Sequence, residues 1–280
     1  MSTEESRLIT ADIANPWGAE VDWSDTPDGS DWFFIVGLGR TGTTVFAKAL
    51  SQHPDCYCAC EHGVVFSVMG LLLSEAVCDV SCEVFSYAAP RLAKGKRPAW
   101  TGTQLRGFAE AWRNAFGEGK ARVGDKQVQY LQQLQFFKRL FPGCRFFLTT
   151  RHSLDHLSAM LAASSVISGL SYDGSPEGAA GLRSLVRQWR GMEREALRDT
   201  AVREVPFAAL CGPETIVGQV EQCWQWLGLQ PDNAIRPQLQ ALGNGGHVGR
   251  WRSDPDIARI LRQGLDDGDD LLAEINSPDW

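Results

Sequence analysis

Hydrophobic positions follow two different periods along the chain, and the changes of period divide it into strands and helices. Short apolar runs predict buried strands, whereas apolar residues spaced three or four apart predict helices. The predicted strands are Trp32–Val36, Asp55–Cys60, Arg122–Lys126, Arg145–Thr150 and Val202–Leu210. The predicted helices are Thr43–Ser51, Val64–Phe116 with a break near residues 94–98, Leu131–Leu140, Leu154–Ser164, Leu182–Leu197 and Glu214–Leu227, and Ser165–Gly181 is predicted to be a loop. Because strands alternate with helices, we expect an α/β fold whose central parallel sheet is flanked by helices.

The first 30 residues differ from the rest, because they are rich in Asp, Ser, Pro and Gly. We therefore expect residues 1–30 to form an N-terminal arm and residues 31–280 to form a single domain. The polar, acidic start is unlike a signal peptide, and the longest apolar run, residues 63–73, is too short to cross a bilayer. A cytoplasmic protein is the prediction.

Charge and cysteine content narrow the classes of ligand. A formal net charge of −7 disfavours nucleic acid as a partner but leaves small anionic ligands open. The eight cysteines include no CxxC pair, which disfavours a zinc site. Cys56, Cys58 and Cys60 alternate on a predicted strand, so we expect them to share one face and to pack as small apolar residues.

A glycine-rich turn, Gly37–Thr44, joins the first strand to the first helix. Its glycines let main-chain N–H groups turn inward, and the helix N-terminus adds positive potential, so the turn suits an anion. Gly37 and Gly42 have the spacing of a P-loop, but Thr43 stands where a P-loop has its lysine. The cation of this turn is Arg40 instead. The turn therefore predicts a phosphate-bearing donor other than ATP with magnesium, and no metal is required.

Four charged side chains follow the ends of four different predicted strands. They are Arg40, Glu61, Lys126 and Arg151. Ligands of parallel sheets bind beyond the carboxyl ends of the strands. We therefore expect these four residues to meet in one site.

The order of these motifs resembles the sulfotransferases that use 3′-phosphoadenosine 5′-phosphosulfate, particularly the bacterial and carbohydrate-type branches. The turn Gly37–Thr44 is similar to the family's 5′-phosphosulfate loop, and Gly124–Lys126 is similar to its Glu/Asp-Lys turn. Leu148–Arg151 resembles its 3′-phosphate element, and Gly249–Arg252 resembles the C-terminal loop that closes over the nucleotide. The resemblance runs from Trp32 to Arg252 and implies the P-loop-like sulfotransferase fold with this donor as co-substrate.

The resemblance also implies which residues hold the donor. The 5′-phosphate would contact Gly39, Arg40, Thr41, Gly42, Thr43 and Thr44, with Arg40 stabilising charge on the bridging oxygen as the bond to sulfur breaks. The 3′-phosphate would contact Arg151, Ser158, Arg250, Trp251 and Arg252, where Trp251 offers a flat surface near the adenine.

The serine of the 3′-phosphate element departs from the family pattern. The family places this serine eight residues after the arginine, whereas Ser158 follows Arg151 by seven. One residue rotates a helix by about 100°, so either a local irregularity restores Ser158 or Ser153 substitutes for it.

The acceptor must lose a proton as it attacks sulfur. The resemblance favours Glu61 as the base, and His62 is the alternative because a histidine titrates near neutrality without help. Lys126 would neutralise the sulfuryl oxygens or orient Glu61. His152, His156 and His247 show no ligand spacing and are treated as structural.

The resemblance implies transfer of a sulfuryl group to a hydroxyl or amine of a small-molecule, lipid or glycan acceptor by in-line displacement. A P-loop small-molecule kinase is the alternative function, but it would need a lysine at Thr43 and an acidic residue ending a strand. A third alternative is a protein that binds the donor without catalysis. No residue pattern selects one acceptor or one oligomeric state.

Overall fold

The computed structural model describes residues 21–22, 28–60, 100–101, 113, 117, 119–163, 175–243, 248–249, 251, 259, 262 and 272. Its central sheet has five parallel strands in the order β3-β5-β2-β6-β7. They are β2 (Trp32–Gly37), β3 (Cys56–Cys60), β5 (Arg122–Lys126), β6 (Arg145–Thr150) and β7 (Val202–Pro206). A separate parallel pair consists of β1 (Val21–Asp22) and β4 (Trp100–Thr101). The predicted α/β fold with a parallel sheet is confirmed.

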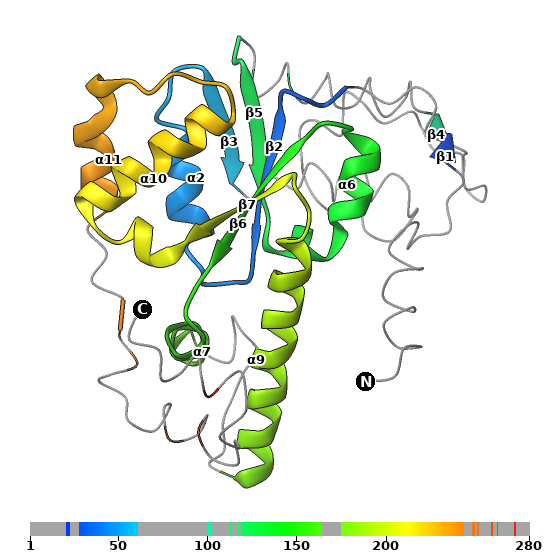
Figure 1. The fold of residues 1–280 in the computed structure, drawn as a ribbon, viewed down its shortest axis with the longest axis vertical. Helices are drawn as coiled ribbons and strands as arrows, with labels where there is room; N and C mark the ends of the chain where they lie inside the picture. Colours follow the sequence, from blue (N-terminus) through cyan, green and yellow to red (C-terminus); the bar gives the residue numbers. More distant parts are fainter. Residues whose placement is uncertain are drawn as a thin grey trace.

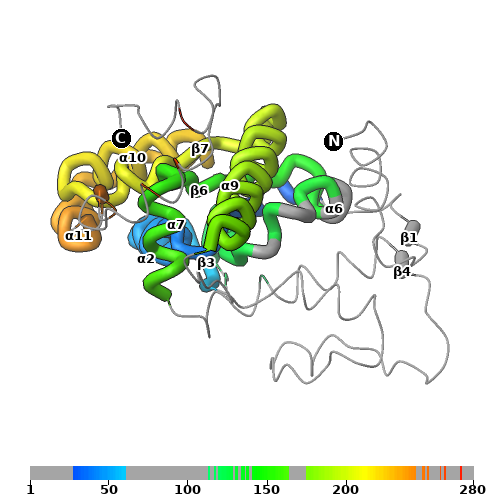
Figure 2. Tube along the Cα trace, turned by 90° about the horizontal axis from the view of Figure 1, so that it is seen from below, coloured from blue at the N-terminus to red at the C-terminus, as the bar shows by residue number. Residues whose placement is uncertain are grey.

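Helices cover both faces of the sheet and one of its ends (Figure 1). One face carries α2 (Thr43–Leu50), α10 (Pro213–Trp226) and α11 (Arg236–Leu242), and the other carries the 3-10 helix η1 (Val128–Gln133) followed by α6 (Leu134–Leu140). Beyond the carboxyl end of β6 lie α7 (Ser153–Ala162) and the long helix α9 (Pro176–Ala196), side by side in both Figures 1 and 2. Two short 3-10 helices are η2 (Phe207–Leu210) and η3 (Asn233–Ile235).

The central strand β2 is buried along its whole length, which explains its continuous apolar sequence. Phe33 and Ile35 pack into the core with α2 and α10. Phe34 points to the opposite face, where its ring lies 4.4 Å from that of Phe137 on α6. Because successive strand residues face opposite sides, one strand supplies both cores and is held firmly in the sheet. The loop after β2 therefore starts from a fixed position.

The structure corrects several predicted elements. Trp100 and Thr101 form the strand β4 within residues 64–116, which are predicted to be helical, and the rest of that segment, apart from residue 113, lies outside the described residues. Helix α6 begins at Leu134 instead of Leu131, because η1 precedes it.

Helix α9 begins at Pro176, within the segment predicted as a loop, rather than at Leu182. The Ser175 side chain caps it by accepting a hydrogen bond from the Gly178 N–H at 2.9 Å, and proline suits the first helical position. The last predicted strand ends at Pro206 instead of Leu210, and η2 follows it.

The cysteines of β3 pack as predicted, with Cys56 and Cys58 buried in the core beside α2 and α10 and Cys60 partly buried against it. Burial raises the pKa of the Cys56 thiol to about 12, so it stays protonated at neutral pH. In the part of the chain that the structure describes, no helix has the length and apolarity to cross a membrane.

Candidate active site

The predicted strand, loop and helix around the glycine-rich turn are confirmed. β2 ends at Gly37, the loop runs from Leu38 to Gly42, and α2 begins at Thr43. Gly42 occupies the N-cap position with φ 92°, and no side-chain hydrogen bond caps the helix. Because the first turn of α2 contains no acidic residue, the positive end of the helix is not neutralised locally. This geometry suits an anion.

Arg40 has a left-handed backbone with φ 69°, and it alone has positive φ among the non-glycine residues that the structure describes. A left-handed residue inside such a loop helps to gather successive main-chain N–H groups into a concave anion site. The Arg40 side chain is exposed, Thr43 is buried and Thr44 is exposed. The loop thus combines a left-handed backbone position with a cationic side chain in solvent.

Lys126 and Asp125 are buried at the carboxyl end of β5, the strand between β2 and β3. Lys126 pairs with Ile35 of β2 and with Cys60 of β3, so it lies beside the start of the glycine-rich loop. The Asp125 carboxylate accepts hydrogen bonds from the Lys126 main-chain N–H at 2.9 Å and from the Tyr130 hydroxyl at 2.6 Å. Lys126 is 1% exposed, so it is not a lysine that extends from a surface turn into solvent.

Arg151 is the first residue after β6, the strand on the other side of β2. Its guanidinium is buried; Nη1 donates a hydrogen bond to the Arg40 carbonyl oxygen at 2.9 Å, and the group lies 4.1 Å from the centre of the Phe207 ring. The structure therefore brings Arg151 into direct contact with the glycine-rich loop. Arg40, Lys126 and Arg151 all lie at the carboxyl edge of the sheet, as their positions after strands predict.

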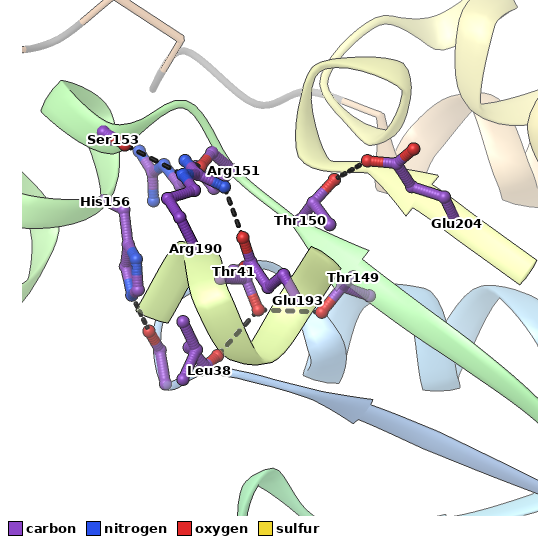
Figure 3. A network of polar contacts seen from close by, with 11 residues as sticks. Leu38, Thr41, Thr149, Thr150, Arg151, Ser153, His156, Arg190, Glu193 and Glu204 are labelled. Atoms are coloured by element: carbon purple, nitrogen blue, oxygen red, sulfur yellow. Dashed lines mark hydrogen bonds and ion pairs between the residues drawn. The ribbon is translucent and has the colours of Figure 1, made fainter. Parts of the chain in front are cut away.

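A buried ion pair on α9 braces the turn that carries Arg151 (Figure 3). Arg190 donates hydrogen bonds to the Arg151 carbonyl oxygen and to the Ser153 hydroxyl, the latter at 2.8 Å from Nε. It also pairs with the Glu193 carboxylate. Ser153 is thus engaged by Arg190, and α7 is helical from Ser153 to Ala162. Contact of Ser158 with the 3′-phosphate stays a prediction.

A small pocket lies next to Arg151. Its lining consists of Arg151, His152, Asp155, Phe207, Ala208 and Val248. The C-terminal segment reaches this place: the Gly249 N–H donates to an Asp155 carboxylate oxygen at 2.8 Å, and the Trp251 ring stacks on the His152 ring with centres 6.0 Å apart. The pocket therefore lies between the end of β6, η2 and the C-terminal segment.

Several predicted site residues lie outside the described residues. These are Glu61, His62, Arg250 and Arg252. Glu61 follows Cys60, the last residue of β3, and Cys60 pairs with Lys126. Their roles stay predictions.

Sequence reasoning missed the contacts of His156 and Arg190. The Nε2 atom of His156 lies 2.8 Å from the Gly39 carbonyl oxygen. In the sequence, His156 follows shortly after Arg151, which stands at the end of a strand. This position is a signal that could have marked His156 as a site residue. Arg190 is 39 residues from Arg151 in sequence, and the local pattern of α9 contains no sign of their contact.

Comparison with known families identifies the family of the chain. A model of the sulfotransferase family matches residues 33–232, a range that includes the glycine-rich loop, Lys126 and Arg151. The chain belongs to the sulfotransferase family. No curated protein matches the sequence of this sulfotransferase.

Solved structures of other sulfotransferases are similar to this one. The sulfotransferase domain of the Synechococcus PCC 7002 olefin synthase has a TM-score of 0.51 and 16% identity, covering 91% of this chain and 97% of that one. A sulfotransferase from Alicyclobacillus acidocaldarius has a TM-score of 0.44 and 17% identity, with coverages of 82% and 93%. Mouse sulfotransferase SULT7A1, complexed with PAP, has a TM-score of 0.44 and 12% identity, with coverages of 78% and 66%. The Synechococcus domain supports the sulfotransferase fold.

Proposed function

We propose that this sulfotransferase moves a sulfuryl group from 3′-phosphoadenosine 5′-phosphosulfate to a hydroxyl or amine of a small-molecule, lipid or glycan acceptor. The observation that carries the proposal is the contact between the glycine-rich loop and Arg151, which sets a buried guanidinium beside a helix N-terminus. Both features favour anions, and they come from adjacent strands. A donor with two separate phosphate groups matches two neighbouring anion-binding elements.

The described residues fit the two ends of such a donor. The loop backbone with Thr43 and Thr44 would hold the 5′-phosphate, and Arg40 would reach the oxygen that bridges phosphorus and sulfur. The buried guanidinium of Arg151, at the edge of the pocket, would bind the 3′-phosphate. The planar fork of a guanidinium can donate to two phosphate oxygens at once, whereas an ammonium group is a compact point charge.

In the proposed reaction, the acceptor oxygen or nitrogen attacks sulfur while the bond between sulfur and the 5′-phosphate oxygen breaks. The acceptor proton passes to Glu61, or in the alternative to His62, and adenosine 3′,5′-bisphosphate leaves. Lys126 would offset negative charge on the sulfuryl oxygens, and Arg40 would stabilise the leaving oxygen. Positioning and charge stabilisation would supply most of the acceleration, as they do in phosphoryl transfer.

A small-molecule kinase is the competing function because it shares the sheet and the phosphate loop. Thr43 in place of the P-loop lysine and Arg151 after β6 argue against it. Calorimetry separates the two: we expect tight binding of adenosine 3′,5′-bisphosphate without metal and no binding of ATP with magnesium. The reverse result would exclude sulfuryl transfer. An assay with radiolabelled donor and a panel of acceptors then separates an enzyme from a protein that only binds the donor.

A further inference from the structure

Three successive carbonyl groups of the glycine-rich loop each accept a hydrogen bond from a side chain, and Figure 3 shows the first of these bonds, from Thr41 to Leu38. The Leu38 oxygen accepts from the Thr41 hydroxyl at 2.6 Å, and the Arg40 oxygen accepts from Arg151. Between them, the Gly39 oxygen is bonded to the Nε2 atom of His156 at 2.8 Å. The three donors come from the loop itself, from the end of β6 and from α7, so the loop is held from several sides.

His156 makes this bond as a neutral ring. It is 2% exposed and packs against the Trp189 ring, with ring centres 4.3 Å apart. The pKa of His156 is lowered to about 3, mainly by burial; the bond to Gly39 opposes this shift, and the nearby charges of Arg190 and Arg151 contribute to it. Since a carbonyl can only accept, the single proton of the neutral ring lies on Nε2.

The planarity of the peptide bond turns these carbonyl contacts into an arrangement of N–H groups. In a trans peptide, the C=O of one residue and the N–H of the next point in opposite directions. The bonds at Leu38, Gly39 and Arg40 therefore direct the N–H groups of Gly39, Arg40 and Thr41 away from their carbonyl partners. The Arg40 N–H belongs to the same peptide unit as the Gly39 carbonyl, which is bonded to His156 on α7. The Arg40 N–H therefore points away from α7.

We propose that His156 is a positioning residue of the donor site: by holding the Gly39 carbonyl, it fixes the Arg40 N–H in the orientation that binds the 5′-phosphate. This inference rests on the proposed function. The left-handed backbone of Arg40 makes such support necessary, because this conformation is costly for a residue with a side chain and persists only when its surroundings hold it. A loop that is already ordered also binds its ligand without a further loss of backbone entropy.

Two substitutions of His156 separate the hydrogen bond from the packing. Methionine and glutamine have similar size and shape, but only glutamine can donate to the Gly39 carbonyl. We expect His156→Met to lower the affinity for adenosine 3′,5′-bisphosphate by about five- to tenfold, the worth of one hydrogen bond, and His156→Gln to stay within about twofold of wild type. Affinity for adenosine 3′-monophosphate, which lacks the 5′-phosphate, should be the same in all three proteins.

His53 provides a matched control. It is also buried, its Nε2 atom is bonded to the Gln230 carbonyl oxygen at 2.9 Å, and its ring packs against that of Trp224. His53→Met removes an equivalent bond beyond the opposite end of α2, together with the bond that Nδ1 accepts from the Asp55 N–H at 3.0 Å. It should lower thermal stability but leave the affinity for both nucleotides unchanged.

The outcomes distinguish this inference from the proposed function. If wild type binds no adenosine 3′,5′-bisphosphate, the proposed function fails. If wild type binds it and His156→Met binds it equally well, or loses both nucleotides equally, the positioning role is wrong while the function stands. Should His156→Met not fold, His156→Phe keeps an aromatic ring against Trp189 but has no donor for the Gly39 carbonyl: a loss confined to the 5′-phosphorylated nucleotide supports the inference, and unchanged affinity overturns it.

Discussion

Arg151 and Arg40 are joined by a hydrogen bond of 2.9 Å, from the guanidinium Nη1 of the first to the main-chain oxygen of the second. The two residues follow adjacent strands of the sheet, β6 and β2. One guanidinium therefore supports the glycine-rich loop while its charge lies beside the pocket. Loss of Arg151 should therefore affect donor binding in two separable ways, through the loop and through the pocket.

Replacement of Arg151 by alanine tests its proposed contact with the 3′-phosphate. Arg151→Ala should weaken the binding of adenosine 3′,5′-bisphosphate by about 2–3 kcal/mol, the range of charge-assisted hydrogen bonds. The binding of adenosine 5′-phosphosulfate should be weakened by much less. Calorimetric titration of both nucleotides measures the difference. Arg203→Ala, on the edge strand β7, is the control and should bind both like wild type. Equal losses for the two nucleotides would remove Arg151 from the 3′-phosphate site.

The base is tested by Glu61→Gln, which keeps the size of the side chain but cannot accept the acceptor's proton as a carboxylate can. We expect turnover to fall by about two to four orders of magnitude while the affinity for adenosine 3′,5′-bisphosphate stays close to wild type. Steady-state assays with labelled donor, combined with calorimetry, separate the two quantities. Unchanged turnover would move the role of base to His62.

Gly42 is required by both its backbone and its surroundings. It has φ 92°, and a Cβ atom there would lie 2.6 Å from the Phe207 ring. Gly42→Ala should therefore lower the free energy of unfolding by more than about 1 kcal/mol and disturb donor binding. Gly191→Ala, on α9 where an added Cβ meets nothing within 4 Å, should instead stabilise the protein by about 0.5–1 kcal/mol. Urea unfolding measures both, and equal effects would contradict the prediction.

The buried pair Arg190–Glu193 should matter far more than the exposed pair Arg198–Glu195, although both join an arginine and a glutamate three residues apart. The side chains of the first pair are 16% and 3% exposed, and those of the second are 77% and 70% exposed. Arg190→Met removes the guanidinium that pairs with the buried Glu193 carboxylate, so we expect a loss of about 3–5 kcal/mol of stability.

Arg198→Ala should change stability by less than about 0.5 kcal/mol. Denaturant unfolding of both variants gives the comparison. The double variant with Arg190→Met and Glu193→Met should recover part of the loss, because it removes the buried charge as well. A double variant no more stable than Arg190→Met would show that the hydrogen bonds of Arg190, rather than the buried charge, dominate.

Acid should destabilise the protein through His156. The unfolded chain takes up a proton at this residue near pH 6.5, whereas the folded protein takes it up only near pH 3. In this interval the unfolded state binds more protons than the folded state. The contribution of His156 to stability is therefore fully present at neutral pH and is lost as the pH falls from about 6.5 towards 3.

The change between pH 7 and pH 4 should be about 3 kcal/mol. Urea unfolding at several pH values, repeated with His156→Gln, isolates this contribution because glutamine does not titrate. Parallel pH profiles for the two proteins would contradict the assignment.

Local patterns determined much of this protein. The apolar run of β2, the glycines after it and the helix that follows are neighbours in sequence, so the phosphate loop could be predicted from residues 32–50 alone. The positions of Arg40, Lys126 and Arg151 after strands were sufficient to predict a shared edge, because all strands of a parallel sheet end on the same side. The early start of α9 was missed because Gly178 and Gly181 obscured the capping signal of Ser175 and Pro176.

Tertiary structure alone decided which side chains support the site. The strand order β3-β5-β2-β6-β7 sets Lys126 and Arg151 on either side of the loop, and strand order follows from how helices pack on the sheet. The bonds from His156 to Gly39 and from Arg190 to Arg151 join residues 117 and 39 positions apart. Such contacts form only when α7 and α9 pack against each other and against the sheet. The short periods of a sequence report which face of an element is buried, but they do not report its partner across the core.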